Sequence, residues 1–123
     1  MILITSNQHR RLLCLNYVQR VSPAELAAAR DEMKALLADL PAGFQLLADF
    51  SQLEFMDPDS VTELGKAMDL FDQREVSLIV RVIPDASKDI GLNILTIFHY
   101  PHHPRVITCQ NLAEALQRIA DWR

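Results

Sequence analysis

The sequence predicts an α/β fold in which a mixed, mostly parallel sheet of about five strands packs with about four helices in a single domain, residues 1–123. Segments with helical spacing alternate with short apolar runs, which is typical of parallel strands joined by helical crossovers. The run Gln45–Phe50 is almost continuously apolar, as in a strand covered on both faces. No low-complexity tract or Pro/Gly-rich linker divides the chain.

The N-terminal segment predicts an antiparallel hairpin. Ile2–Thr5 and Leu12–Val18 have the apolar composition of strands, and the polar residues Ser6–Arg10 separate them. A short polar connection of this kind joins antiparallel neighbours.

A capping box predicts the start of the first helix. Ser22 can accept at the N-cap, Pro23 fits the first helical position and Glu25 can reach back. Pro41–Gly43 ends the helix. Its inner face is predicted to consist of Leu26, Ala29, Met33, Leu36, Leu37 and Leu40.

The second helix is predicted to begin directly after a loop that follows Phe50. Asp57 is the expected N-cap and Pro58 the first helical residue. The expected apolar stripe is Val61, Leu64, Ala67, Met68 and Phe71.

The C-terminal half continues the alternation. The predicted elements are a strand over Val76–Ile83 closed by Pro84 and Asp85, a helix from Ser87 to about Phe98, a strand over Arg105–Cys109 and a helix capped by Asn111. Glu114 stands at the capping-box position of that last helix. Its inner face is predicted to be Leu112, Ala115, Leu116, Ile119 and Trp122.

Charge and hydropathy argue against nucleic acid and membrane as partners. The formal net charge is −4, and the small basic run His9–Arg11 falls in the predicted hairpin turn. Met1–Ile4 is too short for a signal peptide, and Ile90–Phe98 is far shorter than the roughly 20 residues of a membrane helix. We therefore expect a cytoplasmic protein, with Cys14 and Cys109 reduced and buried.

No motif predicts catalysis. The sequence contains no glycine-rich phosphate loop, nucleophile elbow, HExxH or CxxC, and its three glycines stand far apart. We expect no enzymatic activity and no cofactor.

Three of the four histidines lie in the segment His99–Pro104. Clustered imidazoles can bind zinc, which needs at least three protein ligands at a catalytic site. Two prolines stiffen this segment, and the adjacent His102 and His103 are expected to point apart. The prediction is an exposed turn without a metal.

The segment Leu46–Val61 predicts a buried strand, a short loop and an abrupt helix start. It contains Phe55-Met56-Asp57, and it resembles the central motif of the STAS family (sulphate transporter and anti-sigma-factor antagonist), which runs as apolar strand, Phe-Met-Asp-Ser-Ser-Gly, helix. The resemblance extends over roughly Leu12 to Trp122. It implies the STAS fold and a bacterial signalling module that binds an anti-sigma factor or kinase-like regulator.

The chain departs from the family pattern at the phosphorylated position. The resemblance aligns Pro58 with the first serine of the motif, Asp59 with the second serine, which a partner kinase phosphorylates, and Ser60 with the glycine. The phosphorylation site is therefore lost. Asp59 can mimic phosphoserine in part, since a carboxylate carries about −1 and a phosphate about −1.5 to −2. Alternatively, it is only a helix-start residue.

The predicted partner-binding surface consists of Phe55, Met56, Asp57, Asp59, Ser60 and Glu63, flanked by Leu92 and Leu95. Asp59 supplies fixed negative charge and the apolar side chains supply buried area. In the helix that contains Leu92 and Leu95, the side chains expected to cover the sheet are Ile90, Ile94, Ile97 and Phe98. Leu92 and Leu95 then face outward, either as an interface or beneath the loop Tyr100–Pro104.

Two alternative functions remain open. The apolar helix at 90–98 could pair with its copy, which would make the protein a self-associating module and a homodimer. A sheet-and-helix fold also offers crevices beyond its strand ends, and a small-molecule sensor could use one.

Overall fold

The structure is a computed structural model that describes residues 1–85 and 89–122, with side chains from residue 94 onward in the second range. The elements are β1 (Ile2–Asn7), β2 (Leu12–Val21), α1 (Pro23–Leu37), β3 (Gln45–Met56), α2 (Ser60–Gln73), β4 (Leu78–Val82), α3 (Asp89–His99), β5 (Arg105–Cys109) and α4 (Leu112–Asp121). The described strands form one sheet in the order β1-β2-β3-β4-β5. β1 is antiparallel to β2, and every other pair is parallel. The predicted mixed, mostly parallel sheet with helices is confirmed.

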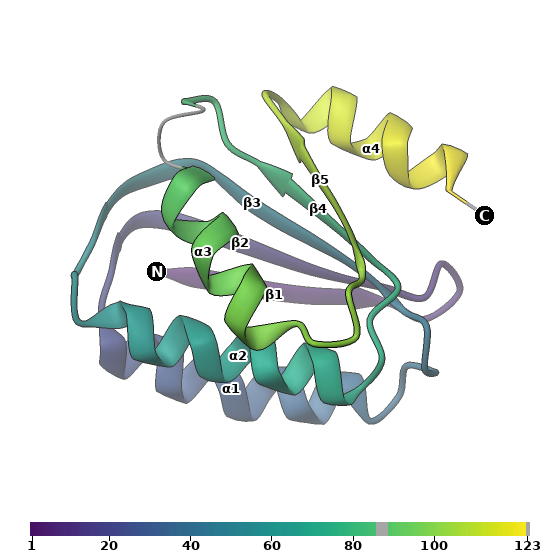
Figure 1. The fold of residues 1–123 in the computed structure, drawn as a ribbon, viewed down its shortest axis with the longest axis horizontal. Coiled ribbons are helices and arrows are strands. Elements are labelled where there is room, and N and C mark those ends of the chain that lie inside the picture. The colour runs from purple at the N-terminus through teal and green to yellow at the C-terminus, as the bar shows by residue number, and fades with distance from the viewer. Residues whose placement is uncertain (86–88, 123) are drawn as a thin grey trace.

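Helices cover both faces of the sheet (Figure 1). α1 and α2 pack on one face around a large apolar core, and Leu95 of α3 joins the same core. α4 packs on the other face, where Ala115 belongs to a smaller core with residues of β2, β3, β4 and β5. Strand β4 is buried along its whole length, so it has the double coverage predicted for the middle of a parallel sheet.

The predicted helix caps of α1 and α4 are confirmed. The Ser22 hydroxyl accepts from the Glu25 N–H at 3.2 Å, and the Asn111 side chain accepts from the Glu114 N–H at 2.8 Å. These interactions span only three residues, and for that reason the sequence pattern predicts them well. The end of α1 was predicted too late, because the helix ends at Leu37 and Leu40 packs from the following turn.

Strand β3 is six residues longer than predicted. The polar sequence after Phe50 indicated a loop, but residues up to Met56 pair with β2, where Arg20 lies opposite Phe55. The register between β2 and β3 shifts after Asp49, whose carboxylate accepts the N–H of Ser51 at 2.8 Å, and again between Leu53 and Phe55. A bulge of this kind bends a strand without ending it. Phe55 and Met56 therefore belong to the sheet and not to a loop.

The predicted inner faces of α3 and α4 are wrong in part. Ile97 and Phe98 were expected to cover the sheet, yet each is 75% exposed, and Ile94 is also exposed. Leu95, expected outside, packs against the core. On α4, Leu112 and Leu116 are exposed, and only Ala115 is fully buried. Amphipathic spacing fixes an apolar side but not the rotation of the helix against its neighbours.

Both cysteines are free. Cys109 is buried as predicted, whereas Cys14 is only half-buried. Burial raises the pKa of both thiols, and the side chain of Thr5 opposes part of that rise at Cys14. Neutral thiols of this kind are poor nucleophiles.

Helix α3 is held against α2 by His99. The Nδ1 atom of His99 lies 2.7 Å from Oδ1 of Asp69, and the imidazole ring sits on the backbone of Gly65. A Cβ atom at residue 65 would lie 2.5 Å from Nε2 of His99, which is closer than real contacts allow. The glycine permits this close approach.

We expect Gly65→Ala to lower the free energy of unfolding by about 1 kcal/mol or more, because overpacking displaces the His99 ring from Asp69. In a His99→Ala background the same substitution should instead raise stability by up to about 1 kcal/mol, since alanine is the better helix former. Urea unfolding of the four proteins in this cycle measures the coupling. Equal effects of Gly65→Ala in both backgrounds would contradict the close contact.

Candidate functional site

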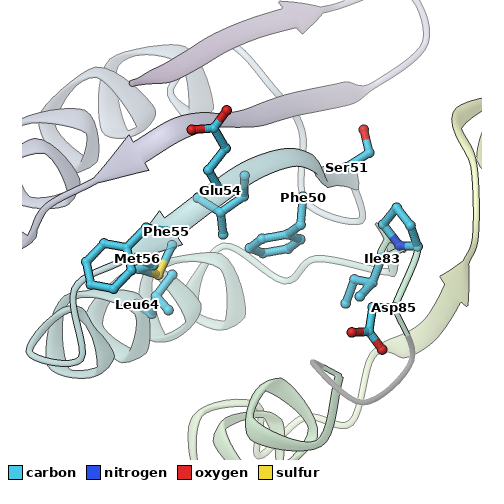
Figure 2. A pocket seen from close by; sticks show the side chains of 10 residues that line it. Phe50, Ser51, Glu54, Phe55, Met56, Leu64, Ile83 and Asp85 are labelled. Atoms are coloured by element: carbon cyan, nitrogen blue, oxygen red, sulfur yellow. The ribbon is translucent and has the colours of Figure 1, made fainter.

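A cavity of about 410 Å³ opens where β3 ends, beside the start of α2 and the segment after β4. Its lining is mostly apolar and consists of Phe50, Ser51, Leu53, Glu54, Phe55, Met56, Leu64, Ile83, Pro84 and Asp85. Figure 2 shows Phe50 in the middle, with Met56 and Leu64 on one side and Ile83 on the other. The carboxylate of Glu54 and the hydroxyl of Ser51 point away from it (Figure 2). Crevices at the carboxyl ends of parallel strands commonly hold ligands.

The floor of this cavity is rigid. The ring of Phe50 stacks on the buried ring of Tyr17, with centroids 4.4 Å apart and planes inclined by 5°. Leu53 and Met56 pack partly against the same core. Side chains fixed in this way lose little conformational entropy when something binds against them.

Phe55 stands at the rim with 48% of its surface exposed. The guanidinium of Arg20, on the neighbouring strand, lies 5.2 Å from the centre of its ring. An exposed aromatic ring held by a cation is a typical anchor at protein interfaces. Met56, the next residue, is half-buried, so the two side chains contribute unequally to the surface.

The start of α2 differs from the prediction. The N-cap is Asp59 and not Asp57, and the helix begins at Ser60 and not at Pro58. Asp57 instead forms a turn before the helix, because its Oδ1 atom accepts the N–H of Asp59 at 3.3 Å. The side chain of Asp59 makes no capping hydrogen bond and is exposed. Its carboxylate therefore faces solvent at the positive end of a helix.

Ser60 does not reach the surface. It is 0% exposed and its Oγ atom has no hydrogen-bond partner in the described part of the chain. Ser60 lies on the buried face of α2, in helical register with Leu64 and Ala67. The same register leaves Val61, predicted inside, 52% exposed.

Glu63 is engaged in ion pairs within the fold and is not free to contact a partner. Its carboxylate pairs with Arg30 of α1 and with Lys66 at 3.2 Å. The hydrogen bond from Arg30, followed by the one from Lys66, lowers the pKa of Glu63. The side chain thus links α1 to α2 and stays ionised at neutral pH.

The helix predicted to flank the surface presents different residues. Leu95 faces the core, and the side chain of Leu92 lies outside the described residues. The outward apolar face of α3 consists of Ile94, Ile97 and Phe98. Sequence reasoning missed this face because it assigned these three residues to the sheet.

The histidine segment is an exposed turn at His102 and His103, as predicted, but two of its residues are engaged with the fold. His102 Nδ1 lies 2.7 Å from the buried carboxylate of Asp72, which also accepts the His102 N–H at 3.3 Å. Tyr100 is buried. Among the described residues, no group of three or more His, Cys, Asp or Glu side chains could hold a metal ion.

Of the residues predicted for the surface, Phe55 and Met56 line the apolar cavity, and Asp57 and Asp59 follow them in the turn between β3 and α2. These groups can bind through apolar contact and negative charge. Sequence reasoning missed the other cavity wall, Ile83 to Asp85. The signal that could have found it is general: β3 and β4 are neighbouring parallel strands, and ligand sites commonly form at the carboxyl ends of such strands. None of the described helices is long and apolar enough to cross a membrane.

Comparison with known proteins supports the fold. No family model matches the sequence, and no curated protein resembles it significantly. Among solved structures, an uncharacterized DUF3478-family protein with a SpoIIAA-like fold from Shewanella loihica PV-4 superposes with a TM-score of 0.71, at 14% identity over 97% of this chain and 92% of that chain.

Two anti-sigma factor antagonists are also similar. Unphosphorylated SpoIIAA has a TM-score of 0.62 at 14% identity, covering 99% of this chain and 100% of that one. The antagonist from Mycobacterium paratuberculosis has a TM-score of 0.60 at 17% identity, covering 98% and 94%. The chain therefore has the SpoIIAA-like, STAS-type fold that the resemblance predicted.

Proposed function

We propose that the protein is a non-enzymatic STAS-like module that binds a protein partner through the surface formed by Phe55, Met56, Asp57 and Asp59. The observation that carries the proposal is the exposed Phe55 ring at the rim of the apolar cavity, which the exposed carboxylate of Asp59 follows in sequence at the start of α2. An aromatic anchor combined with a fixed charge suits a partner with an apolar side chain flanked by cationic groups. The similarity to anti-sigma factor antagonists favours a regulatory partner, such as an anti-sigma factor or kinase-like regulator in a bacterial signalling circuit.

In this proposal Asp59 keeps the charge of the binding surface constant. A phosphorylatable serine would switch between a neutral form and one with a charge of about −1.5 to −2, whereas a carboxylate carries about −1 and is not switched by a kinase. Ser60 offers no substitute, because its hydroxyl is buried. The module would consequently bind without a phosphorylation cycle at residue 59.

We expect Asp59→Lys to weaken partner capture by about tenfold or more, since it reverses a charge of the proposed surface. The measurement is affinity capture from native lysate, with mass spectrometry and Asp59→Ser alongside. Asp39→Lys, a charge reversal at another exposed aspartate, is the matched control and should capture normally. Circular dichroism checks that each variant is folded. Equal capture by wild type and Asp59→Lys would contradict the proposed surface.

One observation favours a second candidate function, self-association through α3. Ile94, Ile97 and Phe98 form an outward apolar face on this helix. Large exposed apolar patches often mark interfaces. A sedimentation mass that stays that of a monomer at all protein concentrations would contradict this candidate.

A further inference from the structure

A second surface lies along β5, the edge strand on the far side of the sheet from β1. The N–H of Arg105 donates to Ser77 and the carbonyl of Cys109 accepts from Ile83, so these residues turn their backbone groups toward β4. Successive residues of a strand point their backbone groups to opposite sides. The N–H and carbonyl of Val106 therefore point outward, and no backbone partner for them exists in the described part of the chain.

Beside this edge runs an open groove of about 430 Å³ between β5 and α4. Its lining consists of Arg105, Ile107, Arg118, Asp121 and Trp122. Ile107 and Trp122 are half-buried and pack against the smaller core, which makes the floor apolar and fixed. α4 lies over one side of β5 near the C-terminus (Figure 1).

The groove contains positive side chains although the chain as a whole is negatively charged. The protein carries a net charge of −4, yet the groove holds two exposed arginines. Within residues 1–85 and 89–122, neither the Arg105 nor the Arg118 guanidinium forms an ion pair. Asp121 is occupied by the side-chain amide of Gln117 at 3.0 Å. In the described part of the chain, two guanidiniums without an ion pair thus lie around an apolar floor.

We propose that this groove binds an extended, acidic segment of a protein partner, which adds as a strand to the edge of β5. Its backbone pairs with Val106, an apolar side chain rests on Ile107 and Trp122, and carboxylates before and after that side chain meet Arg105 and Arg118. Strand addition takes its affinity from main-chain hydrogen bonds and its specificity from alternate side chains. Tryptophan and arginine are the residues that most often dominate binding energy at such surfaces. Two arginines are too few for nucleic acid, whose binding needs many phosphate contacts.

This inference does not rest on the proposed function. The groove lies on the α4 face, whereas the surface around Phe55 and Asp59 adjoins α2 on the opposite face. Either site can fail without the other. The two tests use different residues, and Asp59→Lys should bind at the groove as the wild type does.

Trp122 is the only tryptophan of the chain, so its fluorescence reports occupancy of the groove directly. The probe is a blocked peptide Glu-Thr-Val-Thr-Glu-Thr, in which the glutamates and the valine share one face of a strand. We expect it to change Trp122 emission and to bind at least about tenfold more tightly at low salt than the peptide with glutamine in place of glutamate. N-methylation of the backbone amides that face β5 should weaken binding to a similar extent.

Arg105→Gln and Arg118→Gln should each weaken binding of the glutamate peptide by about threefold or more, while leaving the glutamine peptide unchanged. Arg74→Gln, at an exposed arginine beyond α2, is the matched control and should bind normally. Unchanged emission, equal binding of the glutamine peptide or equal binding of the N-methylated peptide would each overturn the proposal. Equally tight binding of a single-stranded oligonucleotide would show a general polyanion site and would overturn it too.

Discussion

Raising the pH above about 10 is expected to unfold the protein, with both of its tyrosines ionising as it unfolds. Tyr17 and Tyr100 are 3% and 2% exposed, and burial raises the pKa of both phenols well above the ordinary value of 10.0. The positive charge of Arg81 acts in the opposite direction at both rings but is the weaker cause.

The direction in which pH changes the stability follows from how many protons each state binds. Above pH 10 the unfolded chain releases protons that the folded protein retains, so rising pH favours unfolding. The stability held by these neutral phenols is complete below pH 10 and is lost as the pH rises toward their folded pKa values. In the pH range where only the unfolded form is ionised, each tyrosine lowers the free energy of unfolding by about 1.4 kcal/mol per pH unit. Two such groups can bring a typical free energy of unfolding of about 5–15 kcal/mol to zero within a few pH units.

Phenolate absorbance near 295 nm and far-ultraviolet circular dichroism measure the two events together. We expect both signals to change in one cooperative step, because ionisation requires exposure of the rings. Tyr17→Phe and Tyr100→Phe should each reduce the absorbance change by half and shift the midpoint to higher pH. A phenolate signal that grows near pH 10 while the circular dichroism stays native would contradict the burial of the rings.

Replacing one of two phenylalanines should separate folding from binding. Phe44, directly before β3, is 1% exposed, and its ring meets that of Phe71 edge-on at 6.4 Å. Phe44→Ala removes this packing and leaves a cavity between the sheet and α2, so we expect a loss of about 3–5 kcal/mol in the free energy of unfolding. Such a loss is a large part of the total stability of a domain.

Replacing Phe55 by alanine should instead have a small effect on stability and a large effect on partner binding. Its ring is 48% exposed, so Phe55→Ala should cost only about 1 kcal/mol or less, mainly through the lost contact with Arg20. It should nevertheless reduce partner capture severely, because truncating an aromatic anchor removes much of an interface's binding energy. Urea unfolding and affinity capture of both variants measure the two effects. Normal capture by folded Phe55→Ala would remove this ring from the proposed surface.

Parts of the candidate site could be predicted from the sequence. Phe55, Asp57 and Asp59 stand between an apolar run and a predicted helix, and of these three Phe55 lines the cavity in the structure. The cavity itself could not be predicted. One wall comes from β3 and the other from Ile83 to Asp85, and the spacing between them depends on how two distant segments pair in the sheet.

Other errors have the same origin. Ser60 looked exposed because it stands at a helix start, but helical register with Leu64 turns it inward. Phe55 and Met56 looked like loop residues because the sequence before them is polar, yet pairing with β2 keeps them in the sheet. Leu95, expected outside, is inside and Ile97, expected inside, is exposed, because the packing of α3 against distant segments and not its own spacing decides which face is buried.

The sequence by itself determined the order and type of the elements, the α/β class and the helix caps at Ser22 and Asn111. These features depend on side-chain periodicity and on hydrogen bonds between residues a few positions apart. The tertiary structure alone decided how far β3 extends, which face α3 presents and where the cavity and the groove lie. Each of these depends on contacts between segments distant in sequence, whose geometry no local pattern encodes.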